Sequence, residues 1–322
     1  MHNVTIKQLR AFVMLAEQRS FTRAAARLGI SQSALTLQIK DLEAEVGVRL
    51  FDRSTRSLDL TVHATEFLPV ATRMLDQLSR GIEDLLAVAG REKGRVSIAA
   101  GASVISVLVT PALARLSKSH PKIEARLMDT PGADVERHVL NGDADFGIAA
   151  LTRSHSLLAE RLLLKDRIGV LLRVTHPLNK KRNALMWRDL GRYPFGTFRV
   201  GTQARDVLDR HSQLGPSCLP RPAYEVWSVS ALLALAKQGA APAVLPWASA
   251  IPAISSGCIF RPLQGPVLWR ELHVICLRRR SLTPAAQLLL EAILDEVNTL
   301  SRCTNGGANV HVGDIAGMRT VR

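Results

Sequence analysis

The sequence has few aromatic residues, few cysteines and no long hydrophobic run. Aromatic residues make up 4% of the 322 residues, but Val, Leu, Ile and Ala are plentiful, so the composition excludes disorder over most of the chain. Lys, Arg or Pro interrupts the longest apolar stretches before they approach the roughly 18 residues that a membrane-spanning helix needs. The chain starts without the apolar segment and the small-residue cleavage site of a signal peptide. We therefore expect a cytoplasmic protein that makes no contact with a membrane.

The four cysteines and the nine histidines form no recognisable reactive site. The cysteines are far apart and lack metal-ligand spacing, so we expect free thiols at Cys218, Cys258, Cys276 and Cys303. The sequence has no His-x-x-x-His pair, no Gly-rich phosphate loop with Lys and no GxGxxG fingerprint. Residues 101–105 lack the second glycine of a nucleophile elbow. These absences predict a protein that is not an enzyme and that holds no metal and no cofactor.

The chain does have a large aliphatic content and an excess of positive charge. Hydrophobic residues make up 47%, which is enough for two or three domains that each bury a core. The formal net charge of +14 favours an anionic partner such as nucleic acid. Basic residues are densest over residues 165–221, so the charge alone does not locate a DNA-binding domain.

Three helices are predicted within the first 61 residues. The first is indicated by apolar residues at spacings of three and four, namely Ile6, Leu9, Phe12, Val13 and Ala16. Ser20 is a suitable N-cap for a second helix over residues 22–28, and Gly29 suits the left-handed conformation that ends it. Ser31 is a suitable N-cap for a third helix over residues 32–46. Two short helices joined by a tight turn with glycine are typical of a helix-turn-helix.

The third helix is predicted to have one buried and one exposed face. The buried stripe consists of Leu35, Ile39, Leu42 and Val46. Ser33, Thr36 and Lys40 lie on roughly the opposite side, at 100° per residue. A helical bundle with a solvated basic face remains an alternative interpretation of this pattern.

A hairpin is predicted next, over residues 49–61. Arg53 and Arg56 lie near its tip, from which arginine reaches the adjacent minor groove or the phosphates. The order of helix, capped helix pair and hairpin favours a winged helix-turn-helix more strongly than any one element does.

Residues 9–61 also resemble a known family, the LysR-type transcriptional regulators, in their winged helix-turn-helix. The motifs that carry the resemblance are Leu9-Arg10-Ala11-Phe12, Ser20-Phe21-Thr22-Arg23-Ala24-Ala25, Leu28, Ser31-Gln32-Ser33-Ala34-Leu35-Thr36, Gln38-Ile39, Leu42-Glu43, Gly47-Val48-Arg49-Leu50-Phe51-Asp52-Arg53 and Leu60-Thr61. The resemblance implies a surface that contacts DNA from the major groove and from the wing. Its predicted members are Gln32, Ser33, Thr36, Leu37, Lys40, Arg23, Arg53 and Arg56.

Leu37 departs from the family pattern, which often has arginine after the Ser or Thr of the recognition helix. A leucine makes no bidentate contact to guanine, but it is able to touch a thymine methyl group. The departure leaves the role of the domain intact and changes the expected operator sequence.

A long helix is predicted over residues 62–89, about 42 Å in length. Its apolar seam consists of Phe67, Ala71, Met74, Leu78, Ile82, Leu85 and Ala89. A long helix with one narrow seam favours pairing with a second copy, as the family resemblance also implies. A helix that lies along its own chain is the alternative. We therefore expect a DNA-binding domain at 1–61 and a linker and dimerisation helix at 62–90.

The remaining two thirds of the chain alternate between strands and helices, which predicts two α/β lobes with mostly parallel sheets. A break over residues 151–167 suggests that the chain leaves the first lobe there. Residues 141–148 and 240–246 resemble segments of the LysR effector domain, which is itself like a type 2 periplasmic solute-binding protein. The expected effector domain covers 95–300, with lobe one at about 95–165 and 270–300 and lobe two at about 166–269. The whole chain is thus expected to be α+β, ending in a disordered tail at 301–322.

Ligands of α/β sheets bind beyond the carboxyl ends of the strands. That rule and the resemblance select six candidate effector-binding residues, namely Ser103, Thr130, Thr197, Phe198, Ser228 and Ser230. Helix capping or a turn explains several of them equally well. Arg199 and Arg205 lie nearby and favour an anionic effector, although surface solvation is the commoner role of such residues.

The sequence thus predicts a transcriptional regulator that binds double-stranded DNA as a homodimer or homotetramer. A small-molecule effector between the lobes is expected to change the geometry of the assembly and its contact with RNA polymerase. Two alternatives remain. One is a ligand-binding protein or enzyme whose N-terminal helices serve only dimerisation, and the other is an architectural DNA-binding protein without sequence preference.

Overall fold

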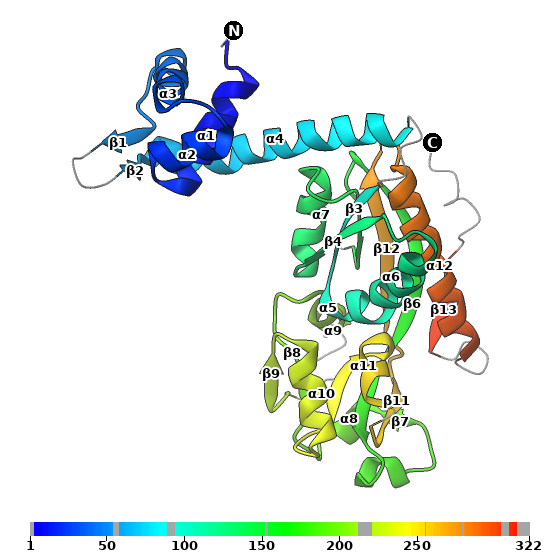
Figure 1. Ribbon diagram of the computed structural model, residues 1–322. Helices are drawn as coiled ribbons and strands as arrows, with labels where there is room; N and C mark the ends of the chain where they lie inside the picture. Colours follow the sequence, from blue (N-terminus) through cyan, green and yellow to red (C-terminus); the bar gives the residue numbers. More distant parts are fainter. Residues whose placement is uncertain are drawn as a thin grey trace. The chain divides into compact units, whose positions relative to one another are not determined.

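The computed structural model describes residues 3–53, 58–88, 94–151, 154–211, 221–254, 256–278, 280–303 and 309–313. The chain divides into two compact units, Met1–Ala89 and Gly90–Arg322. Both contain helices and strands, which confirms the expected mixed fold class (Figure 1).

The N-terminal unit contains three short helices, a two-stranded hairpin and a long helix. Its elements are α1 (Ile6–Gln18), α2 (Phe21–Leu28), α3 (Gln32–Val46), β1 (Phe51–Arg53), β2 (Leu58–Leu60) and α4 (Val62–Val88). The predicted caps are present. The Ser20 and Ser31 hydroxyls accept hydrogen bonds from backbone N–H groups 3.4 and 3.2 Å away, and Gly29 has φ +67°. The second helix begins at Phe21, one residue earlier than predicted.

Phe12 is the centre of the N-terminal core. It is fully buried, and its ring centroid lies 5.7 Å from that of Phe51 in the hairpin and 5.4 Å from that of Phe67 in α4. The hairpin is an antiparallel pair with Phe51 opposite Leu60. One side chain of α1 therefore holds the wing and the long helix together.

The long helix does not start a separate unit at residue 62. Its residues Ala64 and Ala71 are fully buried against the N-terminal core, where Phe67 also packs. The predicted seam is therefore divided, because its first part covers the helix's own domain. Met74 and Ile82, further along α4, are 53% and 48% exposed. Residue 89 lies outside the described residues.

The C-terminal unit has two lobes built around shared strands. Lobe one contains β3 (Arg95–Ala100), α5 (Ala102–Val104), a π-helical turn (Ile105–Val109), α6 (Thr110–Ser119), β4 (Glu124–Asp129), α7 (Gly132–Leu140), β5 (Phe146–Ala149), β12 (Trp269–Leu277), α12 (Pro284–Cys303) and β13 (Val310–Val312). Lobe two contains β7 (Leu185–Met186), α8 (Trp187–Leu190), β8 (Gly196–Phe198), α9 (Gln203–His211), β9 (Tyr224–Val226), α10 (Val229–Lys237), β10 (Ala243–Pro246), α11 (Trp247–Ile254) and β11 (Cys258–Gln264).

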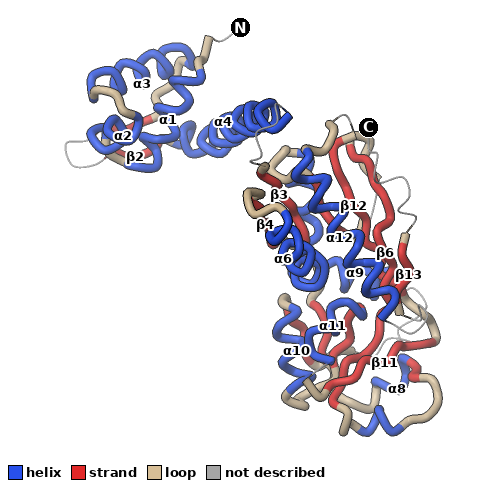
Figure 2. The backbone as a smooth tube through the Cα atoms, turned by 45° about the vertical axis from the view of Figure 1, so that its right-hand side comes forward, coloured by secondary structure: helices blue, strands red, loops and turns tan. Residues whose placement is uncertain are grey.

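The strand β6 (Leu158–Arg173) runs through both lobes (Figure 2). Its first part pairs with β12 and its second part with β10 and β11, all antiparallel. Residues 158–167 of the predicted break are thus the first part of a long strand. Charged residues such as Lys165 and Asp166 interrupt the apolar pattern of this strand, which is why the sequence did not indicate it. The sheets are mixed rather than mostly parallel. In the part of the chain that is described, the parallel pairs are β3 with β4 and β5, β8 with β9 and β10, and β7 with β11.

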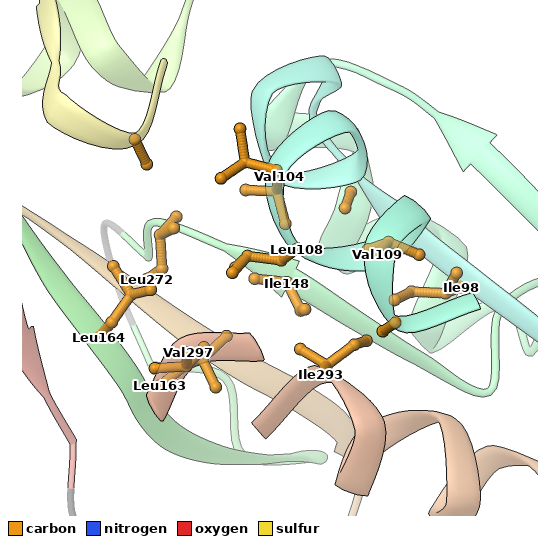
Figure 3. Close-up of a cluster of buried hydrophobic side chains, with 14 of the residues drawn as sticks. Ile98, Val104, Leu108, Val109, Ile148, Leu163, Leu164, Leu272, Ile293 and Val297 are labelled. Carbon is orange, nitrogen blue, oxygen red and sulfur yellow. The ribbon is translucent and has the colours of Figure 1, made fainter. Parts of the chain in front are cut away.

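Lobe one has its core between the sheet and two helices. Ile98 and Ile148 from the strands meet Leu108, Ile293 and side chains of the same kind from the helices (Figure 3). The residues labelled in Figure 3 are all aliphatic, and aliphatic side chains make up most of the cluster, in agreement with the low aromatic content.

The expected disordered tail contains two ordered pieces. Helix α12 continues to Cys303, and β13 then pairs antiparallel with β6, placing Val310 opposite Asp166. Val310 is 2% exposed. The prediction of disorder at 301–303 and 310–312 is therefore wrong, because a short segment without periodicity is still stabilised by pairing with a strand edge.

Gly313 anchors β13, and Gly313→Ala is expected to detach it. The Gly313 N–H donates to Leu163 O at 2.9 Å, and an added Cβ would lie 2.0 Å from Leu162 O. We expect a loss of about 1–3 kcal/mol of stability in the C-terminal unit, measured by thermal unfolding. Gly81→Ala is the matched control, because nothing lies near its added Cβ and alanine favours a helix. An unchanged melting temperature for Gly313→Ala would contradict this account.

Within the described ranges, no helix is long and apolar enough to cross a membrane. Cys258 and Cys276 are buried free thiols, as expected, and burial raises the pKa of both. Cys218 lies outside the described residues.

Candidate DNA-binding surface and interlobe site

The third helix has the two faces that its sequence predicts. Leu35, Ile39 and Leu42 are fully buried, which holds the helix firmly against the domain. On the other side Gln32, Ser33 and Lys40 are exposed, Leu37 is 59% exposed and Thr36 is half-buried. We call these five residues, Gln32, Ser33, Thr36, Leu37 and Lys40, the recognition face.

Hydrogen bonds already orient three polar side chains of the recognition face. The Thr36 hydroxyl donates to Gln32 O at 2.9 Å, and the Thr22 hydroxyl donates to Gln32 Oε1 at 3.3 Å. The hydroxyls of Ser31 and Ser33 lie 3.0 Å apart. Thr36 therefore presents oxygen lone pairs and a methyl group, and Gln32 presents its amide N–H groups.

The wing is fastened to the recognition helix. Glu43 Oε1 accepts hydrogen bonds from the N–H of Leu50 at 2.8 Å and of Phe51 at 3.2 Å. The Thr61 hydroxyl, directly after β2, donates to Arg49 O, just before β1, at 2.9 Å. These contacts set the hairpin's position relative to α3.

Of the three predicted basic contacts outside α3, the structure describes one side chain. Arg23 is exposed and donates from Nη2 to Gln18 O at 2.8 Å, so its guanidinium lies at the end of α1. Arg53 has a described backbone in β1 but no described side chain, and Arg56 lies outside the described residues.

In lobe one, the structure brings Ser103 and Thr130 close to the ends of adjacent strands. Ser103 lies in α5, directly after β3, and Thr130 directly follows β4. The Thr130 N–H donates to Ala100 O at 3.2 Å, at the end of β3. Both residues are half-buried.

In lobe two, the four candidates separate into two groups. Thr197 and Phe198 are 2% and 8% exposed, and the Thr197 hydroxyl donates to Val244 O at 3.2 Å, so both belong to the core. Ser228 and Ser230 are exposed. Ser228, not Ser230, is the N-cap of α10 and accepts from Ala231 N at 3.2 Å.

The two arginines that favoured an anionic effector have other partners. Arg205 pairs with Asp209 at 2.7 Å and with Glu225 at 2.6 Å. Burial acts to lower its pKa, but the hydrogen bonds that the guanidinium donates to these carboxylates outweigh it and raise the pKa. The Arg199 guanidinium lies 5.5 Å from the centre of the exposed Trp227 ring. Two carboxylates thus neutralise Arg205, so its guanidinium does not support an anionic effector.

Asp166 and Arg270 are the functional candidates that the sequence analysis missed. They are 0% and 5% exposed and form a two-pronged ion pair, Nε to Oδ1 at 2.8 Å and Nη2 to Oδ2 at 2.7 Å. Arg270 also reaches Ser103, one of the predicted effector residues. The sequence offered one indication of them: both residues are charged, and both lie at the predicted boundaries between lobe one and lobe two.

Comparison with known proteins agrees with both units. Residues 6–65 match the family described as bacterial regulatory helix-turn-helix protein, lysR family, and residues 89–298 match the LysR substrate binding domain. A probable nitrogen assimilation transcriptional activator from Synechococcus elongatus is 31% identical over 309 residues, which cover 91% of this chain and 96% of that protein. The HTH-type transcriptional regulator YbhD from Escherichia coli is 28% identical over 290 residues, covering 90% and 91%.

Solved structures share the fold. Full-length CbnR in complex with its target DNA aligns with a TM-score of 0.67 at 23% identity, covering 91% of this chain and 99% of CbnR. The helix-turn-helix match, the substrate-binding match and the full-length relatives point to one assignment. The chain belongs to the LysR family of DNA-binding transcriptional regulators, with a helix-turn-helix domain followed by a substrate-binding domain.

Proposed function

We propose that this regulator reads its operator through the recognition face and the wing. The observation that carries the proposal is the third helix, whose apolar face is fully buried while its polar face is exposed and already oriented by hydrogen bonds. Small polar side chains of this kind discriminate base edges in the major groove. Leu37, exposed on the same face, adds an apolar contact suited to a thymine methyl group.

The active assembly is a homodimer or homotetramer, and its site on DNA is an interrupted palindrome. Support comes from α4, where Met74 and Ile82 leave apolar surface exposed on a long helix. A second copy of α4 would cover this surface and set two recognition helices on one face of the DNA.

A small-molecule effector binds between the lobes and acts without a chemical step. Ser103 and Thr130 in lobe one and Ser228 and Ser230 in lobe two are its proposed contacts. Binding there would favour one arrangement of the lobes and so change DNA bending or contact with RNA polymerase. No catalytic activity is proposed, since the full-length relatives named above are transcriptional regulators.

A gel-shift titration tests specific binding directly. The purified protein is titrated against its own upstream intergenic DNA and against a random duplex of equal length, at two salt concentrations. We expect a preference of about a thousandfold or more for the upstream fragment, the range of site-specific proteins. Equal binding that vanishes with salt would favour an architectural protein, and no binding to either would favour a ligand-binding protein.

Substitutions on the recognition face and on the wing are expected to have different effects. Thr36→Ala or Gln32→Ala is expected to relax base discrimination by about 1–3 kcal/mol at one position in each half-site. Arg53→Ala is expected to weaken binding to all sequences and to reduce its salt dependence. Affinities for operator variants with single base changes, at two salt concentrations, measure both effects. Equal losses of Thr36→Ala on specific and random DNA would contradict the assigned face.

A further inference from the structure

Positive charge is concentrated in lobe two rather than in the DNA-binding domain. Residues 166–269 contain 13 Lys and Arg against 5 Asp and Glu, whereas residues 1–61 contain nine against six. Neither the recognition face nor the wing uses this excess. Because a strongly basic surface attracts anionic partners, the position of these charges on lobe two bears on what else the protein binds.

Several of these charges gather around helix α8, at the end of lobe two that is remote from lobe one (Figures 1 and 2). Lys181, in the segment before β7, donates to Asp189 Oδ2 in α8 at 2.5 Å. The ring of His176, in the same segment, lies 5.0 Å from that of Tyr193, just after α8. The two segments are therefore side by side. Their four exposed cations form what we call the lobe-two basic surface, namely Lys180, Arg182, Arg188 and Arg192.

Arg261 holds the backbone beneath one side of this surface. It lies in β11, and its guanidinium donates to the carbonyl oxygens of Asn179, Lys181 and Asn183 at 3.3, 3.1 and 3.2 Å. One half-buried side chain thus fixes the chain through the run Lys180-Lys181-Arg182. Since the segment is already ordered, less conformational freedom is lost when a partner binds.

Little negative charge lies beside the lobe-two basic surface. Between residues 167 and 204 the sequence has eight Lys and Arg and one acidic residue, Asp189. The Asp189 carboxylate is already bound by Lys181 and by the Met186 N–H, the latter at 2.8 Å. In the described part of the chain, this is the one ion pair of the region, so the four cations remain available to a partner.

The composition of the surface fits the phosphates of duplex DNA. Three of its four cations are arginines, whose planar guanidinium is able to donate two hydrogen bonds to one phosphate. Within residues 175–195, which are all described, no large hydrophobic side chain is exposed, and Trp187 is buried. Single-stranded nucleic acids stack on exposed aromatic rings, and protein partners are anchored by buried aromatic residues. The backbone of a duplex is instead bound by charge and hydrogen bonds alone.

We propose that the lobe-two basic surface binds the phosphate backbone of duplex DNA, as a second contact in addition to that of the DNA-binding domain. This contact has no sequence preference, and the affinity that it adds falls as salt rises. It goes beyond the proposed function, because the recognition face and the wing select the operator, whereas lobe two holds DNA of any sequence.

The test measures how DNA binding by the full-length protein depends on salt. Binding constants are determined for the upstream intergenic DNA and for a random duplex of equal length, over a series of salt concentrations. The test variant combines Lys180→Gln, Arg182→Gln, Arg188→Gln and Arg192→Gln. The matched control makes the same change in net charge with exposed cations outside lobe two, namely Arg95→Gln, Lys118→Gln, Arg161→Gln and Arg302→Gln. A charge-keeping variant combines Arg182→Lys, Arg188→Lys and Arg192→Lys.

We expect the test variant to bind both duplexes more weakly. The slope of log K against log salt should become shallower by about 0.9 for each phosphate contact that is lost. The change should be equal on the two duplexes, so the preference for the upstream DNA should stay at its wild-type value. The lobe-one control and the charge-keeping variant should retain the wild-type slope. All substituted residues are exposed, so the urea midpoints of unfolding should also be unchanged.

Two outcomes would overturn the proposal. A wild-type slope in the test variant would exclude the DNA contact and leave an acidic protein surface as the partner. An equal change of slope in the lobe-one control would show that only net charge matters. The proposed function is judged by a different quantity, the preference for upstream over random DNA, so its failure is distinguishable from failure of the lobe-two contact.

Discussion

Asp166→Ala is expected to destabilise the C-terminal unit by about 3–5 kcal/mol, the range for a buried ion pair that loses one partner. Arg270, 5% exposed, would keep its charge and lose both of its short hydrogen bonds to a carboxylate. The Ala248 N–H would lose its acceptor as well. Urea unfolding of the full chain measures the effect as an earlier transition of this unit.

Two variants show whether the loss comes from the uncompensated charge. Asp166→Asn combined with Arg270→Gln removes both charges and is expected to recover most of the stability. The exposed pair Lys165 and Glu271 on the same strands should contribute no more than about 1 kcal/mol when removed. If Asp166→Ala lowered the free energy of unfolding by less than about 1 kcal/mol, then water or a movement of the lobes would be stabilising the charge of Arg270 in place of Asp166.

Phe12→Ala is expected to destabilise the N-terminal unit by about 3–5 kcal/mol, as for other buried aromatic residues. Phe12 is fully buried and contacts Phe51 in the wing and Phe67 in α4. Its removal would leave a cavity where three elements meet. Because operator binding needs the wing and the recognition helix held together, we expect the gel shift to weaken in parallel with stability.

Phe12→Leu and Leu37→Ala serve as controls for this prediction. Leucine retains much of the buried volume, so Phe12→Leu should destabilise the unit less than alanine does. Leu37 is 59% exposed, so Leu37→Ala should change stability by no more than about 0.5 kcal/mol. It should still alter the preferred operator sequence. If the Phe12→Ala variant has the same urea midpoint of unfolding as the wild-type protein, the placement of Phe12 at the centre of the core is wrong.

The helix-turn-helix is the part of the structure that its residues predict most closely. The bounds of α3 match the prediction, and Ser31 and Gly47 stand at its two ends as N-cap and left-handed C-cap. These features depend on contacts within three or four residues, so the local sequence is sufficient to predict them. The exposed and buried faces of α3 follow from the same periodicity.

The predictions that were wrong concern contacts between distant segments. The first half of β6 was taken for a break because charged residues interrupt its apolar run, although Asp166 is buried against a partner 104 residues further along the chain. The strand β13 has no periodicity of its own and is ordered by pairing with β6. The whole predicted seam of α4 was assigned to a second copy, whereas its first two members, Phe67 and Ala71, face their own domain.

The amino-acid sequence specifies the winged helix-turn-helix, the alternation of strands and helices in the two lobes and the membership in the LysR family. Caps, periodicity and short motifs are sufficient for these, because each depends on neighbours in the chain. The tertiary structure decides instead which strands lie side by side, and so which residues meet in the hydrogen-bonded set of Ser103, Arg270, Asp166 and the Ala248 amide. Folding alone brings such residues together, and their burial makes each hydrogen bond of the set sensitive to the others.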